Sequence, residues 1–263
     1  MTTPLQIGEM PFFKFLVGLI RKAMFLSFFL SLFWGTYSCD GRTDSTPSSL
    51  KRAQYVERID TCSLIVLYPK FSHIDLVCGE MPSLKDTSVI LFAGACFTGK
   101  CEPVFRHRNI AGNHVSKGVR YQGYRCNRNT GAFLYANGRW RFVYKNYEEA
   151  MNGMSGGNSA AFSQEMLIHG GKFVKTQRKN TNRNQFRALC QIGDKLCVIE
   201  SAEKMEFGEF KKCLMKVNVR EALYLDMGAG WNYAWYRTSR DSVTELHRKT
   251  HNYGTNWITF YKK

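Results

Sequence analysis

Residues 131–144, GAFLYANGRWRFVY, constrain the fold more tightly than any other stretch, because two short alternating runs flank an Asn-Gly pair. Asn137-Gly138 favours a two-residue type I′ turn, since both residues tolerate a positive φ. That turn would place Tyr135 opposite Trp140 and Phe133 opposite Phe142 on one face. The opposite face would carry Leu134, Ala136, Arg139 and Arg141. The stretch therefore predicts an antiparallel hairpin with one buried face and one exposed face.

A second hairpin is predicted in residues 187–200, RALCQIGDKLCVIE, with Gly193-Asp194 at the turn. In that register Cys190 lies directly opposite Cys197. A cross-strand disulfide and a pair of free buried thiols are both compatible with this placement.

Further strand-like runs are short and separated by turn residues, whereas helical periodicity is rare. The strand-like runs are CSLIVLY (62–68), SVILFA (88–93), EALYLD (221–226), WNYAWYR (231–237) and TNWITFY (255–261). One helix is expected in EFGEFKKCLMKVN (206–218), with Phe207, Phe210 and Leu214 on the buried face and Lys211 and Lys212 pointing away. No regular βα alternation occurs. We therefore expect an α+β fold, a mixed but mainly antiparallel β-sheet core with few helices, in a single domain spanning residues 55–263.

The N-terminal residues 1–38 have the order of a secretory leader. Arg21 and Lys22 precede an apolar run that ends in small residues before Cys39. Cys39 matches the acylated cysteine of bacterial lipoproteins, and an uncleaved membrane anchor is the alternative. Residues 39–54 are rich in Ser and Thr and read as a flexible tether. These features predict an exported protein of the cell envelope, held to the membrane by a lipid or an anchor.

Cysteine number and net charge limit the possible ligands. Eight of the nine cysteines follow Cys39, an even number that permits disulfides in an exported chain. No CxxC or His-containing ligand spacing is present, so we expect no zinc site, and no cofactor is required, although a divalent cation stays open. The formal charge is +16, but the basic residues are scattered, so nucleic-acid binding is not expected.

Asp226 is the first candidate for chemistry, because the apolar run LYL carries this carboxylate to a sheet edge beside glycines. Gly228 could allow a tight turn or the close approach of a ligand. The alternative is an Asp that only caps the turn. Beyond it, Trp231 and Asn232 could offer a ring and an amide to a sugar, and Arg237 a cation.

Arg187 is the candidate for an anionic ligand, since a half-buried guanidinium needs a negative partner. That partner could be a structural Asp or a ligand phosphate. Glu165 could be a second carboxylate for acid/base work or a solvent-facing residue. His114, in a Gly- and Asn-rich loop, could titrate near neutrality. Gly153-Met154-Ser155-Gly156-Gly157 fits a nucleophile elbow, but lacks a strand before it and a helix after it, so a flexible loop is favoured.

Several of these segments together resemble the phosphodiester glycosidase family, including its exported bacterial members. The likeness spans roughly residues 60–263 and is carried in order by AMNGMSGG, SQEMLIHGGK, NRNQFRALCQIGDKLCVIES, EFKKCLMKVNVREALYLDMGAGW and GTNWITFY. Arg187 matches the family's strand-initial Arg, and Asp226 matches its carboxylate before a glycine run. Met227 and Ala229 stand where the family usually has glycines.

The resemblance implies hydrolysis of a sugar joined through its anomeric carbon to a phosphate diester, on a glycan or cell-envelope substrate. Asp226 would then be the main catalytic carboxylate, assisted by Glu165 or His114, and Arg187 would bind the phosphate. The second hypothesis is a non-catalytic envelope lipoprotein that binds glycans with the same fold.

Overall fold

The structure is a computed structural model that describes residues 54–99, 104–228, 232–250 and 253–262. The predictions for the leader (1–38), for Cys39 and for Trp231 therefore lie outside the described residues. Residues 50–263 form one compact unit. Among the described residues, no helix is both long enough and apolar enough to cross a bilayer.

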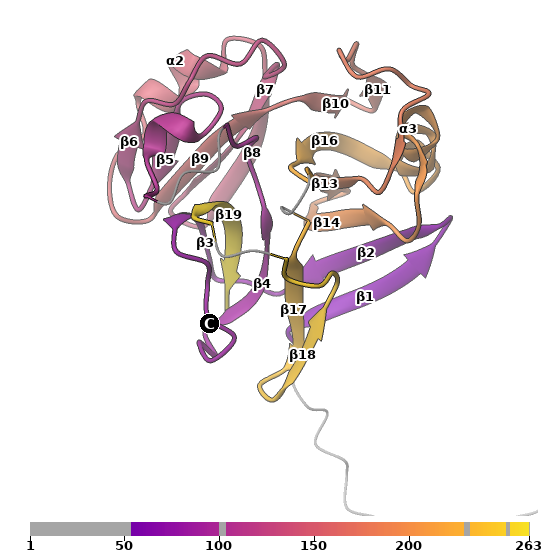
Figure 1. The fold of residues 1–263 in the computed structure, drawn as a ribbon, viewed down its shortest axis with the longest axis horizontal. Helices are drawn as coiled ribbons and strands as arrows, with labels where there is room; N and C mark the ends of the chain where they lie inside the picture. Colours follow the sequence, from indigo (N-terminus) through magenta and orange to yellow (C-terminus); the bar gives the residue numbers. More distant parts are fainter. Residues whose placement is uncertain (1–53, 100–103, 229–231, 251–252, 263) are drawn as a thin grey trace, which may run out of the picture. The chain divides into compact units, whose positions relative to one another are not determined.

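The largest sheet has seven strands in the order β1-β2-β14-β13-β16-β10-β11 (Figure 1). Its strands are β1 (Val56–Thr61), β2 (Leu64–Pro69), β14 (Lys195–Ser201), β13 (Arg187–Ile192), β16 (Val219–Leu225), β10 (Met166–His169) and β11 (Lys172–Phe173). Every neighbouring pair in it is antiparallel.

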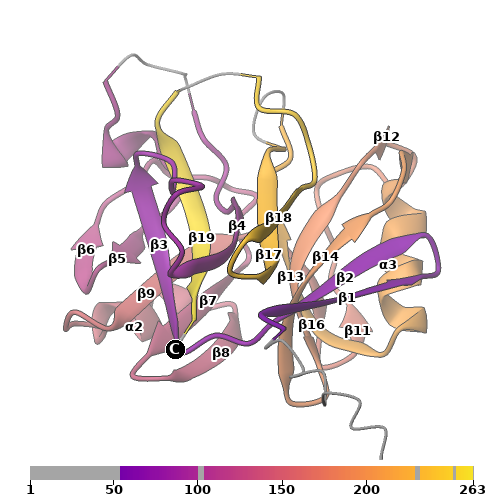
Figure 2. The same cartoon turned by 90° about the horizontal axis from the view of Figure 1, so that it is seen from below.

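Two five-stranded sheets and one short ribbon complete the described strands (Figures 1 and 2). One sheet runs β18 (Ser242–Glu245), β17 (Ala234–Ser239), β4 (Val89–Gly94), β19 (Thr255–Tyr261) and β3 (His73–Gly79). The other runs β6 (Val119–Tyr121), β5 (His114–Ser116), β9 (Ser159–Gln164), β7 (Gly131–Ala136) and β8 (Arg139–Tyr144). The ribbon pairs β12 (Arg183–Asn184) with β15 (Met205–Glu206).

In the part of the chain that the structure describes, the helices are α2 (Tyr147–Asn152) and α3 (Phe207–Lys216), with a 3₁₀ turn η1 at His107–Asn109. Against nineteen strands in the described residues, two short helices do not make an α+β fold, so that prediction is wrong: the fold is mainly antiparallel β. The physical reason is that only residues 207–216 have a sustained helical apolar stripe, whereas the rest of the core is buried by strand alternation.

Both predicted hairpins are confirmed. Asn137 and Gly138 have φ values of 50° and 79°, the positive pair that a type I′ turn requires. Phe133 pairs with Phe142 and Tyr135 with Trp140, as expected. In the second hairpin Cys190 pairs with Cys197, and both thiols are free and buried. Leu134, predicted on the exposed face of the first hairpin, is buried instead, in a small cluster with Val115 and Met151.

The two faces of the seven-stranded sheet bury different cores, because successive residues of a strand point to opposite sides. Leu189, Leu223 and Leu225 join the central core with residues of the two five-stranded sheets. Ala188, Ala222 and Tyr224 pack with α3 on the other side. Figures 1 and 2 both show α3 beside β11 and β16.

Helix α3 buries Phe207, Phe210 and Leu214, as the sequence predicts. Lys211 differs from the prediction, because it is buried rather than pointing into solvent. Its ammonium lies 5.0 Å from the centroid of the Phe207 ring and donates to Thr176 Oγ1 at 3.3 Å. The aliphatic stem of a lysine can cover apolar surface while its charged end finds a hydroxyl and a ring.

Candidate functional site

Asp226 follows directly after β16 and is 6% exposed. Its Oδ1 accepts the backbone N–H of Gly228 at 2.9 Å, and its own N–H donates to the Ala95 carbonyl at 3.0 Å. The backbone N–H of Thr98 also hydrogen-bonds the carboxylate. Asp226 therefore caps the turn, as its alternative interpretation predicts, and its carboxyl group is held at a fixed place at the end of the strand.

Burial raises the pKa of Asp226 to about 6, although the two backbone N–H groups and the charges of Arg178 and Arg128 act in the opposite direction. Desolvation penalises the charged form of a carboxyl group, and here it outweighs the stabilising contacts. A carboxyl with a pKa near 6 is mostly ionised at neutral pH yet can still take up a proton. This is the range in which a side chain works as an acid or a base.

Two guanidinium groups lie within electrostatic reach of Asp226. Arg128 stacks on the ring of Phe97, with its Cζ 4.1 Å from the centroid. Arg178 lies over Tyr224, 4.8 Å from that centroid, and its Nε is buried without a hydrogen-bond partner. Because Tyr224 and Asp226 are two residues apart, they lie on the same face of the chain. The aromatic rings thus hold both cations where their charges reach Asp226 without a direct ion pair to it being present among the described contacts.

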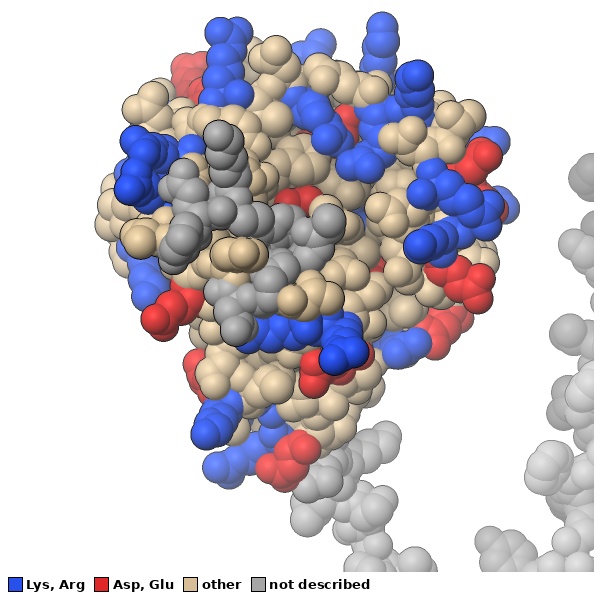
Figure 3. Space-filling view, in the orientation of Figure 1, with Lys and Arg blue, Asp and Glu red and all other residues tan. Residues whose placement is uncertain are grey.

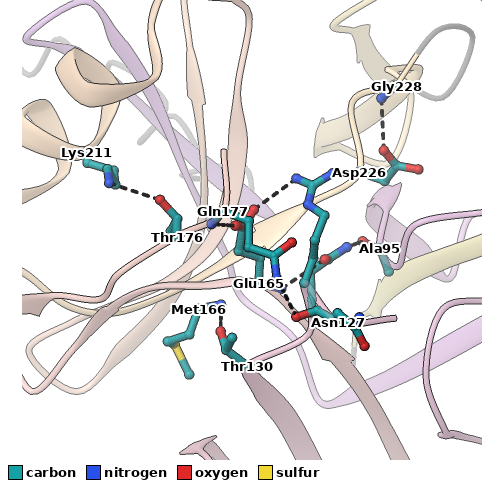
Figure 4. A network of polar contacts seen from close by, with 12 residues as sticks. Ala95, Asn127, Thr130, Glu165, Met166, Thr176, Gln177, Lys211, Asp226 and Gly228 are labelled. Atoms are coloured by element: carbon teal, nitrogen blue, oxygen red, sulfur yellow. Dashed lines mark hydrogen bonds and ion pairs between the residues drawn. The ribbon is translucent and has the colours of Figure 1, made fainter. Parts of the chain in front are cut away.

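Glu165 is buried rather than solvent-facing, with a side chain only 1% exposed. Its Oε2 accepts from Arg128 Nη2 at 3.0 Å, while its Oε1 accepts the backbone N–H of Gln177 at 3.0 Å. Figure 4 shows Glu165 and Gln177 in contact, with Asp226 and Gly228 on the neighbouring strand end. Both carboxylate oxygens are engaged, so Glu165 orients Arg128 and the segment around Gln177.

Hydrogen bonds between Ala95, Gln164, Glu165 and Asp226 join the three large sheets next to this site. The Ala95 carbonyl accepts from Asp226 N and also from Gln164 Nε2 at 3.2 Å. Gln164 Oε1 in turn accepts the N–H of Glu165 at 2.9 Å. The end of β4, the junction of β9 and β10, and the end of β16 are therefore tied together, which fixes Glu165 and Asp226 relative to each other.

Arg187 has a structural partner, but it is a glutamate and not the predicted aspartate. Its guanidinium is fully buried, with Nη2 2.6 Å and Nε 2.7 Å from Glu200 Oε2. Nη2 also donates to the Asn232 carbonyl at 2.8 Å, and His247 Nε2 contacts the other oxygen of Glu200. Only Nη1 is buried without a partner. Binding of a phosphate by Arg187 stays a prediction. Nη1 is the one nitrogen of this guanidinium that would be left to donate a hydrogen bond to the phosphate.

The other residues proposed to bind substrate are placed differently. Gly228 and Asn232 flank the end of the Asp226 turn, where each contributes a backbone group rather than a side chain. Arg237 is buried, and its three nitrogens donate to the carbonyls of Val89, Arg240, Leu84 and Asp86. The guanidinium group of Arg237 therefore stabilises the loop of residues 84–89 through hydrogen bonds to its backbone carbonyls.

His114 lies on β5 and is completely buried, instead of lying in a surface loop. Its polar contacts are His107 Nδ1 at 2.9 Å and the Gly112 carbonyl at 3.3 Å. Burial lowers the pKa of His114 to about 4, so the ring does not titrate near neutrality as predicted. The structure therefore brings together Asp226 and Glu165, and places His114 in a different polar cluster.

Sequence reasoning missed Arg128, Arg178 and Thr98. Both arginines lie in polar, asparagine-containing segments, RCNRNTG and KTQRKNTN, where a basic residue is ordinarily a solvated one. Their only local signal is the absence of an acidic residue nearby in sequence. Figure 3 shows Lys and Arg atoms close beside acidic atoms at the bottom of a hollow near the centre of one face.

A pocket of about 440 Å³ lies next to the chain segment that contains Arg128, although Arg128, Glu165, Arg178 and Asp226 do not line it. It is lined by residues on both sides of Arg128 in sequence, with Tyr124 at the shared edge: Gly112, Asn113, Gln122, Gly123, Tyr124, Arg125, Cys126, Asn127, Asn129, Tyr147 and Glu148. The charge of Asp226 contributes to a raised pKa of Tyr124, about 12, although burial is the larger cause. The pocket and the carboxylate are thus near enough to interact electrostatically.

Comparison with known proteins supports a shared fold and no closer relationship. No family model and no curated protein matches the sequence. Among solved structures, the zebrafish N-acetylglucosamine-1-phosphodiester alpha-N-acetylglucosaminidase catalytic domain, auto-inhibited by its pro-peptide, matches with a TM-score of 0.54 at 13% identity, over 80% of this chain and 82% of that one. A hypothetical protein from Synechocystis matches with a TM-score of 0.42 at 9% identity, over 79% of this chain and 61% of that one. The chain therefore has a fold distantly similar to that of the zebrafish catalytic domain.

Proposed function

We propose that this chain is a hydrolase that cleaves the bond between the anomeric carbon of a sugar and a phosphodiester. The observation that carries the proposal is Asp226, a fixed carboxyl with a pKa near 6, beside the guanidinium groups of Arg128 and Arg178. The distant similarity in fold to a phosphodiester glycosidase and the sequence resemblance support the same chemistry.

The site separates two tasks. Arg128 and Arg178 bind and neutralise the phosphate, since a rigid guanidinium fork suits phosphate oxygens. Phosphate leaves from the anomeric carbon as a phosphomonoester, and its neutralised charge makes strong acid assistance unnecessary. Ionised Asp226 stabilises the positive charge that develops on the sugar and assists the attacking water.

Glu165 is a positioning residue in this scheme, because it touches Arg128 and Gln177 rather than the reacting atoms. Its hydrogen bond from Arg128 Nη2 fixes the orientation of the Arg128 guanidinium group. The adjoining pocket, with its asparagines, tyrosines and Glu148, offers hydrogen-bonding groups to the sugar or to the alcohol of the diester.

The decisive experiment compares Asp226→Asn with the matched change Glu221→Gln in the full chain, using GlcNAc-1-phosphodiesters as substrates. Glu221 is also a shielded carboxylate, 9% exposed, but it pairs with His169 on another part of the sheet. We expect the Asn variant to lose about 10²–10⁴-fold in kcat and the Gln variant to keep wild-type activity. Undiminished turnover by Asp226→Asn would remove Asp226 from the mechanism, and glycan binding without turnover by the wild type would favour the non-catalytic hypothesis.

We further propose that this activity is located in the cell envelope, supported by the leader-like residues 1–38 and by Cys39. Expression in a bacterium with a labelled fatty acid tests the proposal. Label on the wild type but not on a Cys39→Ala variant is expected. A chain that stays in the cytoplasm at full length would contradict it.

A further inference from the structure

Three residues from separate elements of secondary structure place metal-ligating atoms together at the contact between the two five-stranded sheets. Cys78 is near the end of β3, His107 begins η1, and His114 begins β5. One donor atom from each lies within 4.8 Å of the other two. The cluster is separate from the Asp226 site, so what it binds does not depend on the function proposed above.

The hydrogen bonds of His114 prepare one of its nitrogens to act as a ligand. Its Nδ1 lies 3.3 Å from the Gly112 carbonyl, which can only accept, so the proton is placed on Nδ1. Nε2 therefore carries a lone pair, which accepts a hydrogen bond from Nδ1 of His107 at 2.9 Å. A backbone carbonyl that holds the distal N–H of a histidine is the usual support for a metal-ligating ring.

His107 is held in place by aromatic rings. Tyr121 stacks on it with a centroid distance of 3.4 Å and an interplanar angle of 6°, and Phe105 meets it edge-on at 5.1 Å. The ring is half-buried, so its outer nitrogen can reach water when the inner nitrogen binds a metal. Such fixed rotamers reduce the entropy that a ligand set loses on binding.

Burial raises the pKa of the Cys78 thiol to about 12 and lowers the pKa of His114 to about 4, and burial also lowers the pKa of His107. The thiol of Cys78 donates to the Leu76 carbonyl at 3.6 Å. Asp75 and Lys117 are the charged groups whose fields reach Cys78. The aspartate's Oδ1 already accepts the Lys117 backbone N–H at 3.1 Å.

In contrast to the expectation from cysteine and histidine spacing, we propose that Cys78, His107 and His114 form a zinc site. One thiolate and two imidazole nitrogens are the donors that Zn²⁺ prefers, and three protein ligands leave the fourth tetrahedral position open to water. Binding displaces the thiol proton of Cys78 to solvent and moves the remaining proton of His107 to its outer nitrogen. Because the ligands come from β3, β5 and the turn between them, the metal would fasten the two sheets and the 104–113 segment together.

The test uses the full chain, stripped of metal with a chelator and then titrated with Zn²⁺ and with Co²⁺. We expect one equivalent of either metal to bind, with Zn²⁺ raising the Tm. Co²⁺ should produce a thiolate-to-cobalt charge-transfer band and the intense visible bands of tetrahedral coordination. Cys78→Ser should abolish the charge-transfer band and, like His107→Gln, weaken Zn²⁺ binding more than about 100-fold, beyond the effect of losing a supporting contact.

Cys62→Ser and His169→Gln are the matched controls, since they remove an exposed thiol and an exposed imidazole elsewhere. Both controls should bind like the wild type. If the metal-free Cys78→Ser protein does not fold, judged by circular dichroism, the half-exposed His107→Gln decides the question. Binding of no metal, a Co²⁺ spectrum without thiolate, or binding unchanged in His107→Gln would overturn the proposal.

Discussion

Two arginine–carboxylate pairs lie near the same end of β16, and they differ in how far solvent reaches them. The guanidinium of Arg187 is completely buried against Glu200, whereas the Arg128 side chain is 33% exposed while its partner Glu165 is buried. The first pair is closed by Asn232 and His247, whereas the second leaves part of the Arg128 side chain exposed to solvent. The Arg187 pair leaves one guanidinium nitrogen, Nη1, without a hydrogen-bond partner among the described residues, whereas the Arg128 pair is partly open to solvent.

The carboxyl groups beside the two pairs respond to burial in opposite ways. Burial alone would raise the pKa of Glu200, but Arg187 and His247 outweigh it and hold the pKa below its ordinary value. At Asp226, burial prevails over Arg178 and Arg128, and the pKa rises to about 6. A direct, short ion pair therefore fixes a charge, whereas cations at a longer range leave the carboxyl able to exchange protons near neutrality.

The largest expected effect is on stability. Arg187→Met should lower the free energy of unfolding by about 3–5 kcal/mol, because it leaves the Glu200 charge buried without its partner. Arg128→Met should cost only about 1–2 kcal/mol, since water can reach the gap and Gln177 still donates to Glu165. Urea unfolding of both variants measures the difference. Equal losses would show that the two pairs are not different in kind.

For catalytic activity we expect the opposite ranking, with the larger loss in Arg128→Met and the smaller loss in Arg187→Met. Arg128→Met should reduce kcat/KM toward a sugar phosphodiester by about 10²–10³-fold, the cost of removing one donor from a developing anion. Arg187→Met, measured per folded molecule, should lose less. Arg58→Met is the surface control, because Arg58 pairs with the exposed Asp60. A greater loss at Arg187 than at Arg128 would restore Arg187 as the phosphate ligand.

Asp226→Asn should stabilise the protein at neutral pH. The pKa of Asp226 is raised above its unfolded value of 3.8, so its stabilising contribution is present below that value and is lost as pH rises through about 6. Replacing the desolvated carboxylate by an uncharged amide should therefore raise the free energy of unfolding by about 1–3 kcal/mol at pH 7. Thermal unfolding at pH 4 and pH 7 checks the sign, since the gain should shrink at the lower pH. A loss of stability at pH 7 would contradict the assignment.

The smallest effect is the pH dependence of turnover. If ionised Asp226 is the working form, kcat/KM should fall about tenfold per pH unit below pH about 6 and level off above it. Changing Asp226 to Glu should move this limb without removing it. A profile that is flat between pH 5 and 8 would show that the titrating carboxyl does not take part.

Local sequence signals predicted what depends on a few neighbouring residues. The Asn137-Gly138 turn set its own hairpin register, and Gly193-Asp194 placed Cys190 opposite Cys197 in the same way. The run LYLD correctly predicted a strand that delivers Asp226 to its end. Helix α3 was predicted from its apolar stripe, but the burial of Lys211 was not, because Thr176 and Phe173 contact it only in the folded chain.

The sequence by itself determined an antiparallel, hairpin-built chain and a carboxylate at the end of one of its strands, since turn chemistry and residue alternation act over a few residues. Only the tertiary structure decided which arginine meets which carboxylate, and that Cys78, His107 and His114 converge. Those pairings depend on strands distant in sequence lying side by side, and on which face each side chain occupies. Successive side chains of a strand point to opposite faces. A shift of one residue in register therefore moves a side chain from one face of the sheet to the other.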